Sequence, residues 1–259
     1  MPGVSIIVHA RVVSKGCTLS RFRPLSRVIK TRHLFYSLVK RLQPQLVLDI
    51  GSRDGSDALE FRRASPTSRI LAFEANPDLY GKMREDPRVA AAGIEVHNFA
   101  ISNETGEASF GVFNKEKGLG SLMEPGHREV SESLTVKTRR LDEVPELQES
   151  ESTALWIDVE GASFEVVEGA RGIMSSVILV HAEVEFERVF ANQKVAGELS
   201  AQMEGVGFVP FFTGVKRSGQ QGNIVFLRSE IAGRLGTIGP FAGSIAYRIA
   251  ARFGATAPH

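Results

Sequence analysis

Two acidic residues at the ends of neighbouring apolar runs, with glycines after the first, could bind a polar ligand. The segment VLDIGSRDG, residues 47–55, places Asp49, Gly51 and Gly55 between a short apolar run and a helical pattern. Gly51 permits a sharp turn close to a ligand, and Gly55 begins a helix whose free amide groups can receive a polar group. The next apolar run ends at Glu74, where a carboxylate can accept hydrogen bonds from both ribose hydroxyls. The pattern predicts a nucleotide-type site.

The glycine spacing narrows the ligand class. The turn reads G-x-x-x-G, and the chain contains neither G-x-G-x-x-G nor the phosphate-binding G-x-x-x-x-G-K-S/T pattern. A dinucleotide or ATP is therefore disfavoured. An acid suited to an ammonium group, together with a carboxylate suited to a ribose diol, fits S-adenosylmethionine.

Alternating short apolar runs and helical patterns must position these residues. Strand-like runs occupy residues 46–50, 70–74, 94–101, 153–159 and 177–184, and helical patterns occupy residues 57–64, 78–85, 164–174 and 195–204. This alternation predicts an α/β fold with a Rossmann-like, doubly wound, mostly parallel sheet and a ligand crevice at the carboxyl ends of its strands.

Two further pairs of segments modify this plan. Residues 108–113 and 134–140 are strand-like and enclose a Gly-rich and charged stretch, which predicts an inserted β-ribbon or flap over residues 114–133. Residues 208–212 and 223–227 predict an antiparallel pair at the sheet edge.

Charge is distributed unevenly along the 259 residues. Lys plus Arg total 31 and Asp plus Glu total 30, a net charge of +1 that argues against a general polyanion binder. Residues 1–48 carry nine bases and no acid, and residues 231–259 carry three bases and no acid, so an acidic body lies between basic ends. The single Cys17 excludes an internal disulfide, and no apolar run is long enough to span a membrane. We therefore expect a cytoplasmic protein.

The same patterns predict three regions. Residues 1–44 form a basic arm whose residues 25–42 read as an amphipathic helix ending before Pro44, residues 45–228 form the catalytic domain, and residues 229–259 form a C-terminal tail. The helix could pack across the domain, contact a membrane or an acidic partner, or belong to an organelle transit peptide. The tail could be a short packed helix or a homo-oligomer contact.

The motifs resemble the FkbM family of S-adenosylmethionine-dependent methyltransferases. The resemblance is carried by VLDIGSRDGS at 47–56, AFEANP at 72–77, NFAISNETGEASF at 98–110, GSL at 120–122, TRRLDEV at 138–144 and LWIDVEGASFEVVEGA at 155–170. It implies a Rossmann-like fold and methyl transfer to a hydroxyl of a sugar, glycolipid or natural-product acceptor. It covers about residues 45–228, and the last motif is the most specific.

The resemblance implies a role for each matching position. The methionine end of the cofactor would lie against Asp49, Gly51, Ser52 and Gly55, the ribose against Glu74 and Ala75, and the adenine against Asn98, Phe99 and Ala100. Asp158 would lie beside the sulfonium. The chain departs from the family at Trp156, where members often have Lys, and at Arg53. We expect Trp156 to be a buried aromatic in a central strand.

Methylating a hydroxyl requires removal of its proton, and several proton acceptors lie at two adjacent strand ends. These are Asp158, Glu160, His181, Glu183 and Glu185. We expect Asp158 to orient acceptor and cofactor, and His181 or Glu183 to take the proton. The strand period permits these carboxylates to bind Mg²⁺ without requiring it, so Mg²⁺ is possible but no metal site is predicted.

A nucleic-acid methyltransferase and a noncatalytic binding module are the two other classes of function to compare with this sequence. A nucleic-acid amine methyltransferase should carry a D/N-P-P-Y/F run at the fourth strand end, where this chain has IDVEG at 157–161, and its acidic body should repel phosphate backbones. A noncatalytic S-adenosylmethionine-binding module, docking to a membrane or complex through its basic N-terminal helix, remains the alternative to an enzyme.

Overall fold

The computed structural model describes residues 30–114, 118–124, 129–147, 149–216 and 218–235. Cys17, residues 25–29 of the expected N-terminal helix and the tail beyond residue 235 lie outside the described residues. Within the described ranges, no helix combines the length and the apolar character needed to cross a membrane.

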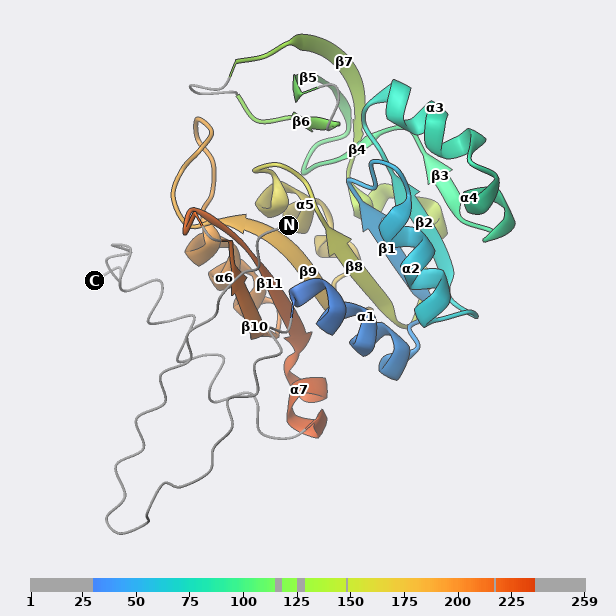
Figure 1. Ribbon diagram of the computed structural model, residues 1–259. Helices are drawn as coiled ribbons and strands as arrows, with labels where there is room; N and C mark the ends of the chain where they lie inside the picture. Colours follow the sequence, from blue (N-terminus) through green and yellow to red (C-terminus); the bar gives the residue numbers. More distant parts are fainter. Residues whose placement is uncertain (1–29, 115–117, 125–128, 148, 217, 236–259) are drawn as a thin grey trace, which may run out of the picture.

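The centre of the fold is a seven-stranded sheet in the order β10-β11-β9-β8-β1-β2-β3 (Figure 1). Its strands are β1 (Leu46–Ile50), β2 (Arg69–Phe73), β3 (Glu95–His97), β8 (Thr153–Ile157), β9 (Val177–Glu185), β10 (Phe208–Val215) and β11 (Gln221–Arg228). Strand β1 pairs in parallel with β2 and β8, and β8 pairs in parallel with β9. Strand β11 is antiparallel to both of its neighbours. The predicted doubly wound sheet with an antiparallel edge pair is confirmed.

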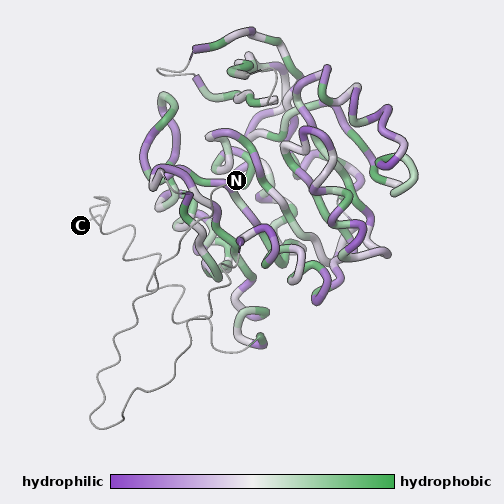
Figure 2. The backbone as a smooth tube through the Cα atoms, viewed as in Figure 1, coloured by the Kyte–Doolittle hydropathy of each residue, from purple (hydrophilic) through white to green (hydrophobic). Residues whose placement is uncertain are grey.

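Helices cover both faces of this sheet because its strands are apolar on both sides. The helices are α1 (Thr31–Leu42), α2 (Ser56–Ala64), α3 (Pro77–Glu85), α4 (Pro87–Ala91), α5 (Ser163–Gly169), α6 (Ala196–Gly205) and α7 (Ser229–Leu235), with single 3-10 turns at Leu141–Glu143, Pro145–Leu147 and Arg171–Ile173. Alternate strand residues separate into two hydrophobic clusters, one with α5 and α6 and one with α1 to α4. Hydrophilic residues colour much of the outer surface of α2 and α3 (Figure 2).

The helix α1 is part of this fold. It contacts α2 and the strands β9, β10 and β11. Phe35 and Val39 are fully buried, and the Phe35 ring meets Phe61 and Trp156 edge-on at centroid distances of 5.6 and 5.2 Å. The described part of the helix therefore packs across the sheet, which was the first of its three interpretations.

A second, four-stranded sheet carries the predicted insertion. It has the order β4-β7-β5-β6, formed by β4 (Ala100–Ile101), β5 (Gly106–Asn114), β6 (Leu119–Ser121) and β7 (Glu132–Arg139). Strands β5 and β7 pair antiparallel, which confirms the ribbon. The predicted strand over residues 94–101 is instead two strands, because β3 ends in the main sheet and β4 pairs with β7. In Figure 1 the small sheet lies beyond the end of the main sheet at which β1 and β8 finish.

Candidate active site

Side-chain alternation brings four acids to one face of the main sheet. On each of four adjacent strands, a buried residue facing α1 is followed two positions later by an acid: Val47 by Asp49, Ala72 by Glu74, Trp156 by Asp158, and His181 by Glu183. Successive side chains of a strand point to opposite faces, so residues two apart share a face. The acids therefore form a row across the carboxyl ends of β2, β1, β8 and β9.

A cavity of about 150 Å³ opens beside this row. Seven of the residues predicted to bind the cofactor line it: Gly51, Ser52, Glu74, Ala75, Phe99, Ala100 and Asp158. Residues from α1, from the first turn of α2 and from the small sheet complete the wall. The cavity thus lies between the main sheet and the inserted sheet, where the topology predicts a ligand.

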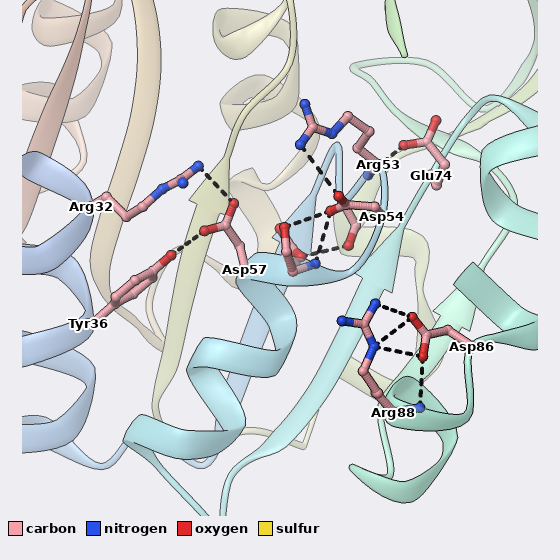
Figure 3. Close-up of polar contacts among 11 residues, drawn as sticks. Arg32, Tyr36, Arg53, Asp54, Asp57, Glu74, Asp86 and Arg88 are labelled. Carbon is pink, nitrogen blue, oxygen red and sulfur yellow. Dashed lines mark hydrogen bonds and ion pairs between the residues drawn. The ribbon is translucent and has the colours of Figure 1, made fainter. Parts of the chain in front are cut away.

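Glu74 is held rigidly at the rim of this cavity. Its side chain is almost completely buried, and its two oxygens accept hydrogen bonds from the backbone amides of Arg53 and Asn76, both at 2.8 Å. Figure 3 shows Glu74 beside Arg53 at the turn that follows β1. Burial raises the pKa of Glu74, and the amides of Asn76 and Arg53 oppose that rise. The arrangement presents a fixed acceptor that suits a pair of hydroxyls.

Asp49 supports the turn rather than lining the cavity. Its Oδ2 accepts a hydrogen bond of 2.6 Å from Ser52 Oγ, and its buried Oδ1 has no hydrogen-bond partner among the described residues. Burial, followed by the charge of Asp57, raises the pKa of Asp49 well above its usual range. Asp49 therefore lies behind Ser52, in surroundings that disfavour its ionised form.

Gly55 and Asn98 also lie behind the cavity wall. A side chain at Gly55, where φ is +74°, would press against Val89 and Met83, so this glycine permits close packing of α2 against α3 and α4. Asn98 donates hydrogen bonds from Nδ2 to the carbonyls of Glu74 and Ala75, at 2.9 and 3.2 Å. These two residues shape the site without facing it.

A second group of interacting charges lies at the ends of β8 and β9. It consists of Asp158, Glu183 and Lys216. Asp158 lines the cavity, and the protonated carboxyl group of Glu183 behind it donates a hydrogen bond to the Asp158 carboxylate. Lys216, at the end of β10, forms an ion pair with Glu183. Burial and the neighbouring Asp158 raise the pKa of Glu183 to about 9, against the opposing charge of Lys216. Glu183 therefore keeps its proton at neutral pH, beside the Asp158 carboxyl group.

His181 lies apart from the cavity. Register places it opposite Trp156, and the two rings stack at 3.7 Å with an interplanar angle of 7°. Neither ring nitrogen has a hydrogen-bond partner within the described ranges, and burial lowers the pKa of His181 to about 3. A ring that resists protonation this strongly is a weak proton acceptor, so this placement favours the carboxylates over His181 for that role. Trp156 is the buried aromatic expected from the sequence.

Helix α1 adds residues that the sequence did not single out. Arg32 lines the cavity and pairs with Asp57 at 3.2 Å, while the Tyr36 hydroxyl donates a hydrogen bond to the same carboxylate (Figure 3). In the sequence, Arg32 could be noticed only because it lies off the apolar face of this helix, and its contact with Asp57 follows from the packing of α1. A base of the N-terminal arm thus belongs to the site.

Ser121 connects the inserted sheet to the loop that follows β8. Its Oγ donates to the backbone carbonyl of Glu160 at 2.5 Å and accepts from the amide of Met123 at 2.9 Å. Gly118 to Leu122 line the cavity opposite Asp158 and Glu160. The predicted flap therefore closes one side of the cavity.

The charges of the cavity suit a cationic ligand. Five acids line it (Asp54, Asp57, Glu74, Asp158 and Glu160) and two bases (Arg32 and Arg53). S-adenosylmethionine carries a sulfonium, an ammonium and one carboxylate, and its ribose diol matches the fixed carboxylate of Glu74. No group of three potential metal ligands occurs in the part of the chain that the structure describes. Glu185, considered for Mg²⁺, instead accepts hydrogen bonds from Gln193 at 2.6 Å and Gln221 at 3.2 Å.

A sheet of this order, with a glycine turn after β1 and a buried, amide-bound acid after β2, is typical of a methyltransferase-type α/β domain. Residues 49–210 match the methyltransferase FkbM domain, and the chain belongs to this family. It is therefore a methyltransferase.

Two curated relatives are methyltransferases. The 2-O-methyltransferase NoeI of Sinorhizobium fredii is 29% identical over 180 residues, which cover 64% of this chain and 73% of NoeI. The hexuronic acid methyltransferase AglP of Haloferax volcanii is 28% identical over 145 residues, which cover 55% of this chain and 56% of AglP. The chain thus spans little more than half of AglP.

Among solved structures, an FkbM methyltransferase from Methylobacillus flagellatus matches with a TM-score of 0.47 and 12% identity, over 71% of this chain and 44% of that one. The O-methyltransferase TomG from Streptomyces achromogenes, solved with S-adenosylmethionine, matches with a TM-score of 0.47 and 15% identity, over 76% of this chain and 78% of TomG.

Proposed function

We propose that this protein uses S-adenosylmethionine to methylate a hydroxyl group of a sugar, free or within a glycolipid or other glycan. The observation that carries the proposal is the pairing of two sites on one row of acids: a fixed diol acceptor at Glu74 and a proton-holding carboxyl pair at Asp158 and Glu183. The relatives named for 2-O-methylation and for a hexuronic acid support a sugar acceptor.

The cofactor supplies a methyl group on a positively charged sulfur, so methylating a hydroxyl releases one proton and leaves the sulfur neutral. Glu74 would hold the ribose of the cofactor, and Asp158 and Asp57, which also line the cavity, would face its positively charged groups. Asp158 is the member of the carboxyl pair that faces the cavity, so the acceptor hydroxyl gives its proton to Asp158. Glu183 stays protonated behind it and hydrogen-bonds to it. The small sheet closes the site so that the acceptor is held in line with the methyl group.

The test is methyl transfer from radiolabelled S-adenosylmethionine to a panel of saccharides that carry free vicinal hydroxyls. We expect label in an acid-stable methyl ether, and mass spectrometry of the product locates it. Neutral hexoses, deoxyhexoses and hexuronic acids form separate arms of the panel, and polyols without a ring are the control. If S-adenosylhomocysteine binds in calorimetry but no saccharide is methylated, the sugar assignment is rejected in favour of a noncatalytic binding module.

A further inference from the structure

Lys216 is a charged residue that the proposed chemistry does not use, although it touches the proton-holding pair. It lies at the end of β10, outside the cavity wall, and its ammonium group pairs with Glu183. The Glu183 side chain is 6% exposed and the Lys216 side chain 45% exposed. Lys216 therefore reaches from the surface to a buried carboxyl group.

The edge strands fix this contact. Strand β11 pairs with β9 so that Asn223 lies opposite Glu183, and the β10–β11 hairpin returns so that the backbone amide of Lys216 donates to the Gln221 carbonyl at 2.7 Å. A side chain at Gly222 would lie 2.4 Å from the Gly214 carbonyl, so close pairing of the two strands requires glycine there. The hairpin thus delivers the Lys216 side chain to the end of β9.

The charged surroundings of Glu183 include groups from several elements. Asp158, at the end of β8, raises the pKa of Glu183 directly, and Glu160, from the following loop, raises the pKa of Lys216. Arg32 of α1 affects the pKa of His181, and the charges of Asp57 of α2 and Asp158 affect each other. On its own strand, Glu185 is engaged by Gln193 and Gln221. Lys216 is the cation that directly contacts Glu183 within the described ranges, so its charge has the largest opposing effect on the carboxyl pair.

We propose that Lys216 is a positioning residue of the methyl transfer: through its ion pair with Glu183, it sets the pH range in which Asp158 can accept the acceptor proton. This inference rests on the proposed function. Asp158 can take a proton only when its own carboxyl group is ionised. A nearby cation favours the ionised form, so it extends the active range to lower pH.

The direction in which the pH profile of turnover moves distinguishes this role from a purely structural one. In Lys216→Met both carboxyl groups lose the cation, so the pKa of each step of the pair should rise, by roughly one unit for a lost partner at this range. The pH profile of turnover should move to higher pH, with a rate about tenfold lower on its acid side and an equal or higher rate on its alkaline side. Lys216→Arg keeps the charge and should keep the wild-type profile.

Two measurements on the full chain test this. Carbon-13 NMR titration of the ligand-free protein follows the carboxyl groups, with Glu183→Gln and Asp158→Asn identifying the signals. The pH profile of methyl transfer is then measured with the saccharide that the acceptor panel identifies. Lys194→Met is the matched control, because Lys194 forms a comparable exposed pair with Glu198 at 3.2 Å, is 41% exposed and lies outside the cavity wall. It should change neither measurement.

Upward shifts of both the carboxyl titration and the rate profile in Lys216→Met, with neither in Lys216→Arg, would support the proposal. An unmoved titration would overturn it, as would a moved titration with an unmoved profile in an active enzyme. A uniform loss of rate at every pH would also overturn it, because that marks a structural role. If the wild-type protein methylates no saccharide while the titration still shifts, the proposed function has failed, and this inference is overturned with it.

Discussion

Glu74 and Glu183 are buried to nearly the same extent at the ends of strands in one sheet, but they have opposite surroundings. Glu74 faces two backbone amides, which fix its orientation and favour its ionised form. Burial and the neighbouring carboxyl group of Asp158 raise the pKa of Glu183, and Lys216 only partly offsets that rise. The difference shows how one residue type serves two purposes: backbone amides make a fixed hydrogen-bond acceptor, whereas a carboxyl neighbour makes a group that holds a proton.

The sharpest way to break this comparison is Asp158→Asn. The amide cannot take a proton, so we expect turnover to fall by roughly 10²- to 10⁴-fold, the usual contribution of a general base. Affinity for S-adenosylhomocysteine, measured by calorimetry, should fall much less than turnover, because Glu74 is untouched and this product lacks the sulfonium charge. Wild-type turnover in this variant would show that the carboxyl pair does not carry the proton.

Glu74→Gln tests the proposed role of Glu74 as a fixed hydrogen-bond acceptor. One oxygen becomes an amide NH₂ that opposes either the Arg53 or the Asn76 amide, so a buried donor is left unpaired and the diol loses an acceptor. We expect the dissociation constant of S-adenosylhomocysteine to rise about 10- to 100-fold, which corresponds to roughly 1.5–3 kcal/mol. Glu95→Gln is the control, because Glu95 is exposed and pairs with Arg69 at 2.6 Å, outside the cavity wall. A loss of affinity in Glu183→Gln but not in Glu74→Gln would reverse the two assignments.

The smallest effect on turnover is expected for His181→Phe. This variant removes the neutral imidazole beside Glu183, so it shows whether the carboxyl groups alone account for the proton transfer. Because the folded pKa of His181 is about 3, below its unfolded value, this histidine contributes stability above about pH 6.5 that is lost as pH falls toward 3. The free energy of unfolding of the variant should therefore decline less steeply between pH 6.5 and 4, by up to about 1.4 kcal/mol per pH unit.

Urea unfolding at several pH values measures this slope. Turnover at neutral pH should stay within about threefold of wild type, since the substitution removes unpaired polar atoms and keeps an aromatic ring beside Trp156. A folded His181→Phe protein without methyl transfer would restore His181 as the proton acceptor.

The parallel sheet and the acids at its strand ends could be predicted from the sequence because both depend on local periodicity. The two-residue period alone places Asp49, Glu74, Asp158 and Glu183 on one face. The depth of each residue could not be predicted: Asp49 and Glu74 both end apolar runs, yet Asp49 lies behind Ser52 while Glu74 lines the cavity. That distinction depends on where the turn after β1 folds back.

Residues from distant elements were missed for a different reason. Arg32 enters the site because α1 packs on the sheet through Phe35, and Lys216 because β11 inserts between β9 and β10. The short strand β6 exists only through its pairing with β5. The pattern of each segment can indicate its own helix or strand, but it does not indicate which distant residue that element will contact. His181 shows the converse case, because its residue type suggested catalysis while its register with Trp156 assigns it to the core.

The turn at Gly51 has one more consequence. The Asp158 amide donates to the Ile50 carbonyl at 2.9 Å, and a methyl group on Gly51 would lie only 2.3 Å from the Asp158 carbonyl oxygen. The turn proposed to bind the cofactor and the segment proposed to carry the proton acceptor are therefore in direct backbone contact, with no adjustable side chain between them. Acceptors of different size cannot be accommodated by moving these two segments apart. We therefore expect divergence or redesign of acceptor choice to act through the described residues of β5 and β6 rather than through these two segments.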